Sequence, residues 1–135
     1  MQNAKCKMQN KKNYMRNGKS NYDLQKKTKK FALNIIAFCN CLSEDFSGRT
    51  IRNQLFRCGT SVGANYRAVC IAKTKKDFIA KLGIVQEEAD ETRYWLELLE
   101  ESGMVVNEEI KKLYSEASQI YAMVVASMKT AKRSI

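Results

Sequence analysis

The chain has 135 residues, of which 28% are charged and none is proline or histidine, and its net charge is +10. This length suits one domain, and the absence of proline leaves long helices uninterrupted, so we expect a single all-helical domain. The lack of histidine argues against zinc sites, and no apolar run approaches the length of a membrane span.

Positive charge is concentrated at the front of the chain. Residues 1–30 hold ten Lys and Arg against the single acid Asp23, whereas residues 83–116 hold ten acids against three bases. This polarity favours a polyanion on one surface and a basic partner, or a second copy of the chain, on another. The alternative is a charged surface that serves solubility alone.

Residues 1–21 are rich in Asn and Lys and show no apolar period. They therefore lack the apolar surface that would offset the entropy of ordering them. We predict a basic, disordered arm at residues 1–21 and a four-helix bundle at residues 22–135. Whether a bound polyanion orders the arm stays open.

The first predicted helix covers residues 22–42. Its apolar face follows steps of four and three, through Leu24, Thr28, Phe31, Ile35, Phe38 and Leu42. Its lysines fall on the other side as a cationic ridge of Lys26, Lys27, Lys29 and Lys30. Residues 43–48 are predicted to break the helix.

The second predicted helix covers residues 51–72, with Thr50 as its N-cap. Its core stripe comprises Ile51, Leu55, Cys58, Val62, Tyr66 and Val69. Gly59 and Gly63 lie beside this stripe, and each costs about 1 kcal/mol relative to alanine in a helix. We therefore expect both glycines to admit the backbone of a neighbouring helix.

The third and fourth predicted helices complete the bundle. The third runs from a Thr74 cap, with Asp77 three residues later, to a stop at Gly103; its heptad seam is Phe78, Leu82, Val85, Ala89, Thr92, Leu96 and Leu99. The fourth covers residues 108–131 after an Asn107 cap, with Ile110, Leu113, Ala117, Ile120, Val124 and Met128 inward. Short breaks between four helices predict an all-α, antiparallel up-down-up-down four-helix bundle.

Two acids on the third helix, Glu88 and Glu91, lie on a second stripe beside the seam. One reading is acid/base chemistry or a di-metal site, but such bundle sites take a Glu-x-x-His pair from two helices and the chain has no histidine. The other reading is a structural polar clasp with the second helix, because buried charges persist only when paired. The residues of the predicted clasp are Arg57, Ser61, Asn65, Arg67, Glu88, Glu91 and Trp95.

The nucleophile candidates Ser61 and Cys58 have no histidine to activate them. The cysteines are odd in number and form no C-x-x-C pair, as expected of reduced thiols in a cytoplasmic protein. We therefore expect no enzyme, no catalytic residue, no metal and no cofactor.

The basic side chains are the functional candidates. They lie on the first helix, at the start of the second and at the turn into the third: Lys26, Lys27, Lys29, Lys30, Arg49, Arg52, Lys73, Lys75 and Lys76. Each phosphate of a nucleic acid that these side chains neutralise releases counterions, and this release favours binding. No base-reading motif is present, so recognition by shape and charge is predicted.

The stretch from Gly59 to Leu96 carries a resemblance to a known family. The strings GTSVGANYRA (59–68), DFIAKLGIV (77–85), EEADE (87–91) and YWL (94–96) are long and ordered. On these the chain resembles the 23S rRNA intervening-sequence proteins of bacteria, whose relatives include the accessory protein of diversity-generating retroelements. The resemblance implies antiparallel four-helix bundles that assemble into a homopentameric ring with a positive surface. The retroelement relatives bind nucleic acid and a reverse transcriptase.

Taken together, these features predict a non-enzymatic, oligomeric protein that binds RNA or DNA without strong sequence specificity. The alternative is a protein-interaction scaffold or accessory subunit, for example of a reverse transcriptase. A homo-oligomer is also expected from apolar and small residues beyond the needs of one core, namely Gly59, Gly63, Ile84 and Trp95. No membrane partner is expected.

Overall fold

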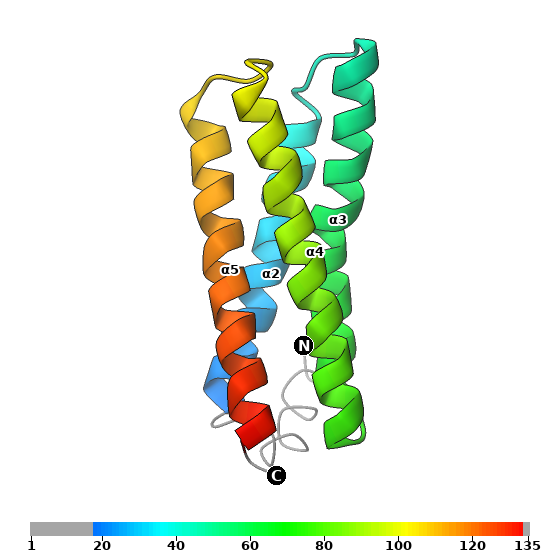
Figure 1. Cartoon of the computed structure of the whole chain (residues 1–135), viewed down its shortest axis with the longest axis vertical. Helices are drawn as coiled ribbons and strands as arrows, with labels where there is room; N and C mark the ends of the chain where they lie inside the picture. The colour runs from blue at the N-terminus through cyan, green and yellow to red at the C-terminus, as the bar shows by residue number, and fades with distance from the viewer. Residues whose placement is uncertain (1–17, 134–135) are drawn as a thin grey trace.

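The structure is a computed structural model that describes the backbone of residues 18–133 and the side chains of residues 23–133. Its helices are α2 (Gly18–Cys39), α3 (Phe46–Cys70), α4 (Lys75–Glu101) and α5 (Glu108–Arg133). Consecutive helices run in opposite directions (Figure 1), so the predicted antiparallel four-helix bundle is confirmed. The predicted arm, apart from its last four residues, lies outside the described part of the chain.

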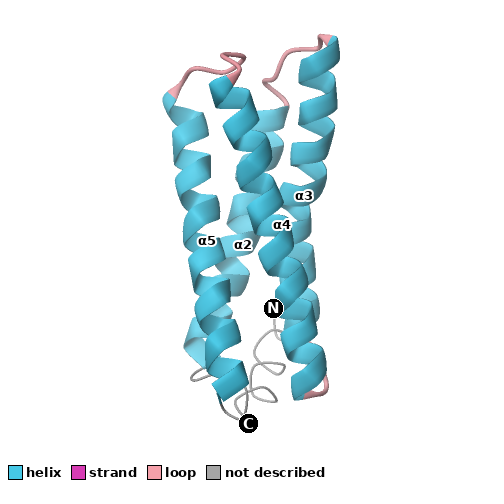
Figure 2. Ribbon diagram, viewed as in Figure 1, coloured by secondary structure: helices cyan, strands magenta, loops and turns pink. Residues whose placement is uncertain are grey.

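Each helix packs against two others. The pairs in contact are α2 with α3, α3 with α4, α4 with α5, and α2 with α5. Only short loops join the helices, at the two ends of the bundle (Figure 2). The buried apolar side chains of these helices form one core between them.

The core consists of the apolar stripes expected from the sequence. Tyr66, Phe31 and Phe78 are its largest fully buried side chains. Fully burying a side chain such as Leu, Ile or Phe contributes about 1.5–3 kcal/mol, so these stripes supply most of the driving force for folding. Three predicted core residues pack only partly buried at its edge, namely Leu42, Ile51 and Met128.

The predicted N-cap Thr50 is wrong. Helix α3 begins at Phe46, five residues before the predicted start, and Asp45 caps it by accepting a hydrogen bond from the Gly48 N–H at 2.7 Å. A Cβ on Gly48 would lie 2.8 Å from the Ser43 carbonyl oxygen, so this glycine permits the tight entry into the helix. Thr50 instead donates to the Phe46 carbonyl within the first turn.

Helix α2 differs from its prediction at both ends. It begins at Gly18, so residues 18–21 belong to the helix and not to the arm. It ends at Cys39 instead of residue 42, because the Cys41 and Leu42 N–H groups bond back only three residues, to Phe38 and Cys39. The predicted caps at Thr74 and Asn107 are confirmed, and Gly103 has the left-handed φ of 81° typical of a helix stop.

The two core glycines of α3 both face α2. A Cβ on Gly63 would lie 3.1 Å from the Thr28 carbonyl oxygen, so Gly63 admits a neighbouring backbone as predicted. A Cβ on Gly59 would meet the Ile35 side chain at 2.9 Å, not backbone. Because both glycines are buried inside one bundle, they give no support to the predicted oligomer interface.

Candidate nucleic-acid interface and polar clasp

The predicted cationic ridge lies on the outer side of α2. Lys26, Lys29 and Lys30 are exposed, and Lys27 is half-buried. The Thr28 backbone packs against Gly63, in the last third of α3, which places this ridge toward the α3–α4 end of the bundle. The turn residues Lys73, Lys75 and Lys76 belong to that same end, where they widen the positive surface.

The other two candidates, Arg49 and Arg52, lie at the opposite end of α3. The structure therefore does not gather all nine predicted residues into one patch. Arg52 is engaged by Glu44, with Nη1–Oε2 and Nη2–Oε1 distances of 2.8 and 3.3 Å. These hydrogen bonds lower the pKa of Glu44. Arg49 is exposed, and its Nη1 donates to the Glu44 carbonyl oxygen at 3.0 Å.

Charge divides the bundle by helix. The neighbouring helices α2 and α3 contain one acid between them, Asp23, whereas α4 contains eight acids and four bases. The basic faces of α2 and α3 thus form one positive side, which is suited to a polyanion.

The polar clasp joins α3 to α4 through one arginine. Arg57 Nη2 lies 2.6 Å from Glu91 Oε2, and Arg57 Nη1 lies 3.6 Å from Glu88 Oε1. The Trp95 indole N–H also donates to Glu91 Oε2, at 3.1 Å. Four of the seven predicted clasp residues therefore meet.

The remaining three predicted clasp residues do not reach the acids. Asn65 donates to the Ser61 carbonyl of its own helix at 2.9 Å. Arg67 is exposed and forms no ion pair within residues 23–133. At about 100° per residue, Arg67 lies well away from the side of α3 that carries Ser61 and Asn65.

The two clasp carboxylates have different environments. Burial raises the pKa of Glu88, whose Oε1 is buried without a hydrogen-bond partner, and Arg57 offsets this only in part. Burial acts the same way on Glu91, but the hydrogen bonds from Trp95 and Arg57 outweigh it and lower the pKa of Glu91. Glu91 is thus the main acceptor of the clasp, and the desolvation cost of Glu88 is offset only in part.

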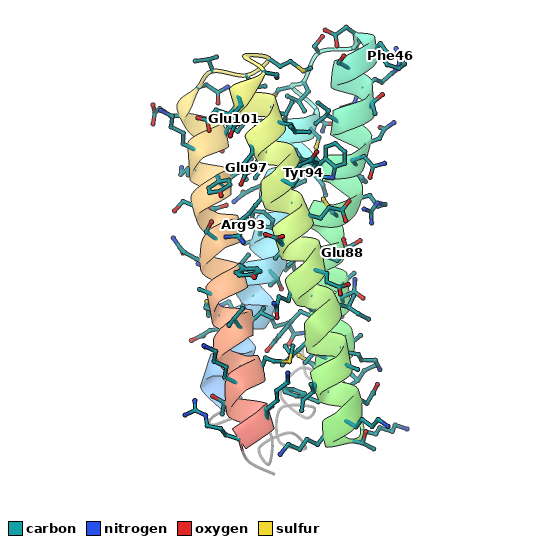
Figure 3. All side chains as sticks on the ribbon, in the orientation of Figure 1. Phe46, Glu88, Arg93, Tyr94, Glu97 and Glu101 are labelled. Atoms are coloured by element: carbon teal, nitrogen blue, oxygen red, sulfur yellow. The ribbon has the colours of Figure 1, made fainter. Side chains whose placement is uncertain are left out.

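A second polar seam, between α4 and α5, was not predicted. The Arg93 guanidinium stacks 4.1 Å from the centre of the Tyr121 ring and pairs with Asp90 at 2.7 Å. The Tyr114 hydroxyl donates to Glu97 at 2.8 Å. Arg93 and Glu97 point toward α5, and Glu88 toward α3 (Figure 3). In the sequence, the three-residue spacing of Asp90 and Arg93 was the signal that could have predicted their ion pair on one face of the helix.

The cysteines of the described region are free thiols. Cys39 and Cys58 are buried, and burial raises the pKa of each to about 11, so they remain neutral. Within residues 23–133, no group of three or more Cys, Asp or Glu side chains is placed to hold a metal ion. None of the described helices is long and apolar enough to cross a membrane.

Comparison with known proteins gives a family and a fold. The model of the family described as 23S rRNA-intervening sequence protein matches residues 20–126. The chain is also similar to a crystal structure from Bacteroides thetaiotaomicron, described as a protein with unknown function from the S23 ribosomal protein family. The two share 31% identity over 82% of this chain and 98% of the other, with a TM-score of 0.75. No curated protein matches the chain.

Proposed function

Because the chain belongs to the 23S rRNA-intervening sequence protein family, we propose that it binds nucleic acid through the basic side formed by α2 and α3. The observation that carries this proposal is the charge of these two adjacent helices, which present Lys and Arg with Asp23 as their one acid. Phosphates neutralised there release counterions, which supplies sequence-independent affinity. The family description makes RNA the first ligand to test, and duplex DNA the second.

The proposed role is recognition of shape and charge, without catalysis. The lysines of α2 sit on long, flexible stems that follow a phosphate backbone but do not select a base. The main clasp acid, Glu91, is committed to Arg57 and Trp95, which supports a structural role for it.

We further propose that the protein acts as a closed homo-oligomer, a pentamer if it follows the family it resembles. Support comes from the outer face of α4, where Ile84 and Tyr94 are 43% and 52% exposed among acidic residues. These exposed apolar side chains lie outside the basic side formed by α2 and α3, so contact between copies through α4 leaves that side open to nucleic acid.

A second candidate function rests on that same face. As a scaffold or accessory subunit, for example of a reverse transcriptase, the chain would use α4 to bind a basic protein partner. The exposed Ile84 and Tyr94 would then contact the partner, and nucleic acid would be incidental.

The test compares a variant that lacks the charges of the ridge with a control variant that loses the same charge on another helix. In one variant Lys26, Lys27, Lys29 and Lys30 become Gln; in the control, four exposed lysines of α5 become Gln, namely Lys111, Lys112, Lys129 and Lys132. Both variants lose the same net charge. Fluorescence anisotropy with a structured RNA and a duplex DNA should show a loss of affinity of at least about tenfold for the ridge variant and a much smaller loss for the control.

Equal losses in the two variants would mean that net charge alone drives binding, which contradicts an interface on α2. Absence of binding by the wild type at low salt would favour the scaffold function.

A further inference from the structure

Helix α3 differs from the other helices in the kind of charge it carries. Its 25 residues include no acid, and all its bases are arginines. It also exposes two phenylalanines, Phe46 at 78% and Phe56 at 46%. Arginine and an exposed aromatic ring share the ability to stack on flat surfaces.

These side chains lie along one outer line of the helix. At about 100° per residue, they fall within a narrow arc opposite the buried Leu55 and Val62. The residues of this arginine–phenylalanine stripe are Phe46, Arg49, Asn53, Phe56, Thr60 and Arg67. Phe46 projects from the outer end of α3 (Figure 3). At about 1.5 Å per residue the stripe extends for roughly 30 Å.

The two arginines of the stripe have no carboxylate partner. Within residues 23–133, Arg49 and Arg67 form no ion pair, in contrast to Arg52 and Arg57. The nearby loop acids are already engaged, Glu44 by Arg52 and Asp45 by the Gly48 N–H. The stripe can therefore accept added negative charge without displacing a bridge.

We propose that the stripe binds single-stranded nucleic acid, with unpaired bases stacked on Phe46 and Phe56 and phosphates paired with Arg49 and Arg67. The proposal rests on the proposed nucleic-acid function and adds the class of ligand. Single strands expose the faces of their bases, whereas a duplex buries them, so exposed rings in a positive field favour the single strand.

The surroundings of the stripe are better suited to a single-stranded nucleic acid than to a folded protein. The stripe is one residue wide, whereas a stable protein interface needs about 800 Å² from each partner. The adjacent α2 continues the positive field through Lys29 and Lys30. Asn53 adds a hydrogen-bonding group between the two stacking positions.

The test compares strand types and ring variants. Binding of labelled oligouridine, oligothymidine and a duplex, each of about 20 nucleotides, is measured by anisotropy at one salt concentration. Replacing Phe46 and Phe56 together by Leu keeps apolar side chains but removes the rings, and should weaken single-strand binding about tenfold or more while changing duplex binding less than about twofold. The two single strands distinguish RNA from DNA, and binding of either supports the proposal.

Two controls separate stacking from other causes. Replacing both phenylalanines by Tyr retains the rings and should retain single-strand binding. Val106→Ala removes exposed apolar surface from the loop between α4 and α5, away from the stripe, and should leave binding unchanged.

Unchanged single-strand binding by the Leu variant, or an equal loss for the duplex, would overturn the proposal while leaving the basic interface of α2 intact. If the Leu variant sediments as a smaller species than the wild type, the stripe is an interface between copies, which also overturns it. A wild type that binds none of the three probes would instead refute the proposed function itself.

Discussion

Arg57 holds two carboxylates of α4 at unequal distances, and the shorter contact carries the clasp. Glu91 accepts from both Arg57 and Trp95, whereas Glu88 Oε1 is buried without a hydrogen bond. Arg57 is about half exposed, so solvent screens the pair and limits its contribution to stability.

We expect Glu91→Ala to lower the free energy of unfolding by on the order of 1 kcal/mol, because it removes the acceptor of both bonds. The matched control is Glu87→Ala, an exposed glutamate of the same helix, which should change stability by less than about 0.5 kcal/mol. Urea unfolding followed by circular dichroism measures both. Equal effects would show that the clasp contributes nothing specific.

Glu88 should make stability depend on pH in the opposite sense to most carboxylates. The groups facing it are Arg57, Glu91 and Glu87, and burial raises its pKa above the ordinary 4.5. A carboxyl with a raised folded pKa binds more protons in the folded state, so its contribution falls as pH rises from below 4.5 through the folded pKa.

Glu88→Gln removes this titration. The stability of the variant relative to the wild type should therefore increase between about pH 4 and about pH 7, as measured by urea unfolding at both values. Glu87→Gln controls for the loss of one negative charge. A relative stability that decreases over this range would mean that Arg57 stabilises the Glu88 carboxylate fully.

At the level of the helices, the contact of α2 with α3 depends on Gly63. A Cβ there would lie 3.1 Å from the Thr28 carbonyl oxygen and 3.3 Å from its carbon, and backbone atoms cannot move aside as a side chain can. The helices would have to separate, although alanine favours helix formation over glycine by about 1 kcal/mol.

Gly63→Ala should therefore destabilise the bundle by about 1–3 kcal/mol. Gly83→Ala is the matched control, because its Cβ would meet only the Met128 methyl at 3.8 Å. It should stabilise by up to about 1 kcal/mol through helix propensity alone. Thermal unfolding separates the two variants, and a stabilised Gly63→Ala protein would contradict the close approach of α2.

The helices and their core could be predicted because apolar periodicity determines which face is buried. The start of α3 could not be predicted, because residues 43–48 contain serine and glycine, which are typical of a break between helices. The helix begins within this segment because the Asp45 carboxylate accepts a hydrogen bond from the Gly48 N–H. Among the clasp candidates, Arg57 was one of four polar residues on α3. Only the packing angle of α4 decides which of them reaches the acids.

For the whole molecule, the separation of charge is the property with the largest consequences. Basic α2 and α3 adjoin each other, and α4 carries the acids together with exposed Ile84 and Tyr94. Part of this polarity follows from the sequence alone. Only the structure shows that α2 and α3 lie side by side and form one positive side.

The proposed homo-oligomer predicts a sedimentation-equilibrium mass of several chains at micromolar concentration. Changing Ile84 and Tyr94 to Lys should shift the protein toward monomer, because it places charge on an apolar contact. The exposed Ala122 of α5, changed to Lys, serves as the control. A wild-type protein that sediments as a monomer contradicts the oligomer.

The central claim is electrostatic binding of nucleic acid by the α2 ridge, and the salt dependence of affinity tests it most directly. The logarithm of the association constant should fall linearly with the logarithm of salt concentration, with a slope of about 0.9 per phosphate contact on duplex DNA. Changing Lys26, Lys27, Lys29 and Lys30 to Gln should reduce that slope in proportion to the number of phosphates that the ridge neutralises. An unchanged slope in this variant, or no binding by the wild type at low salt, would contradict this claim.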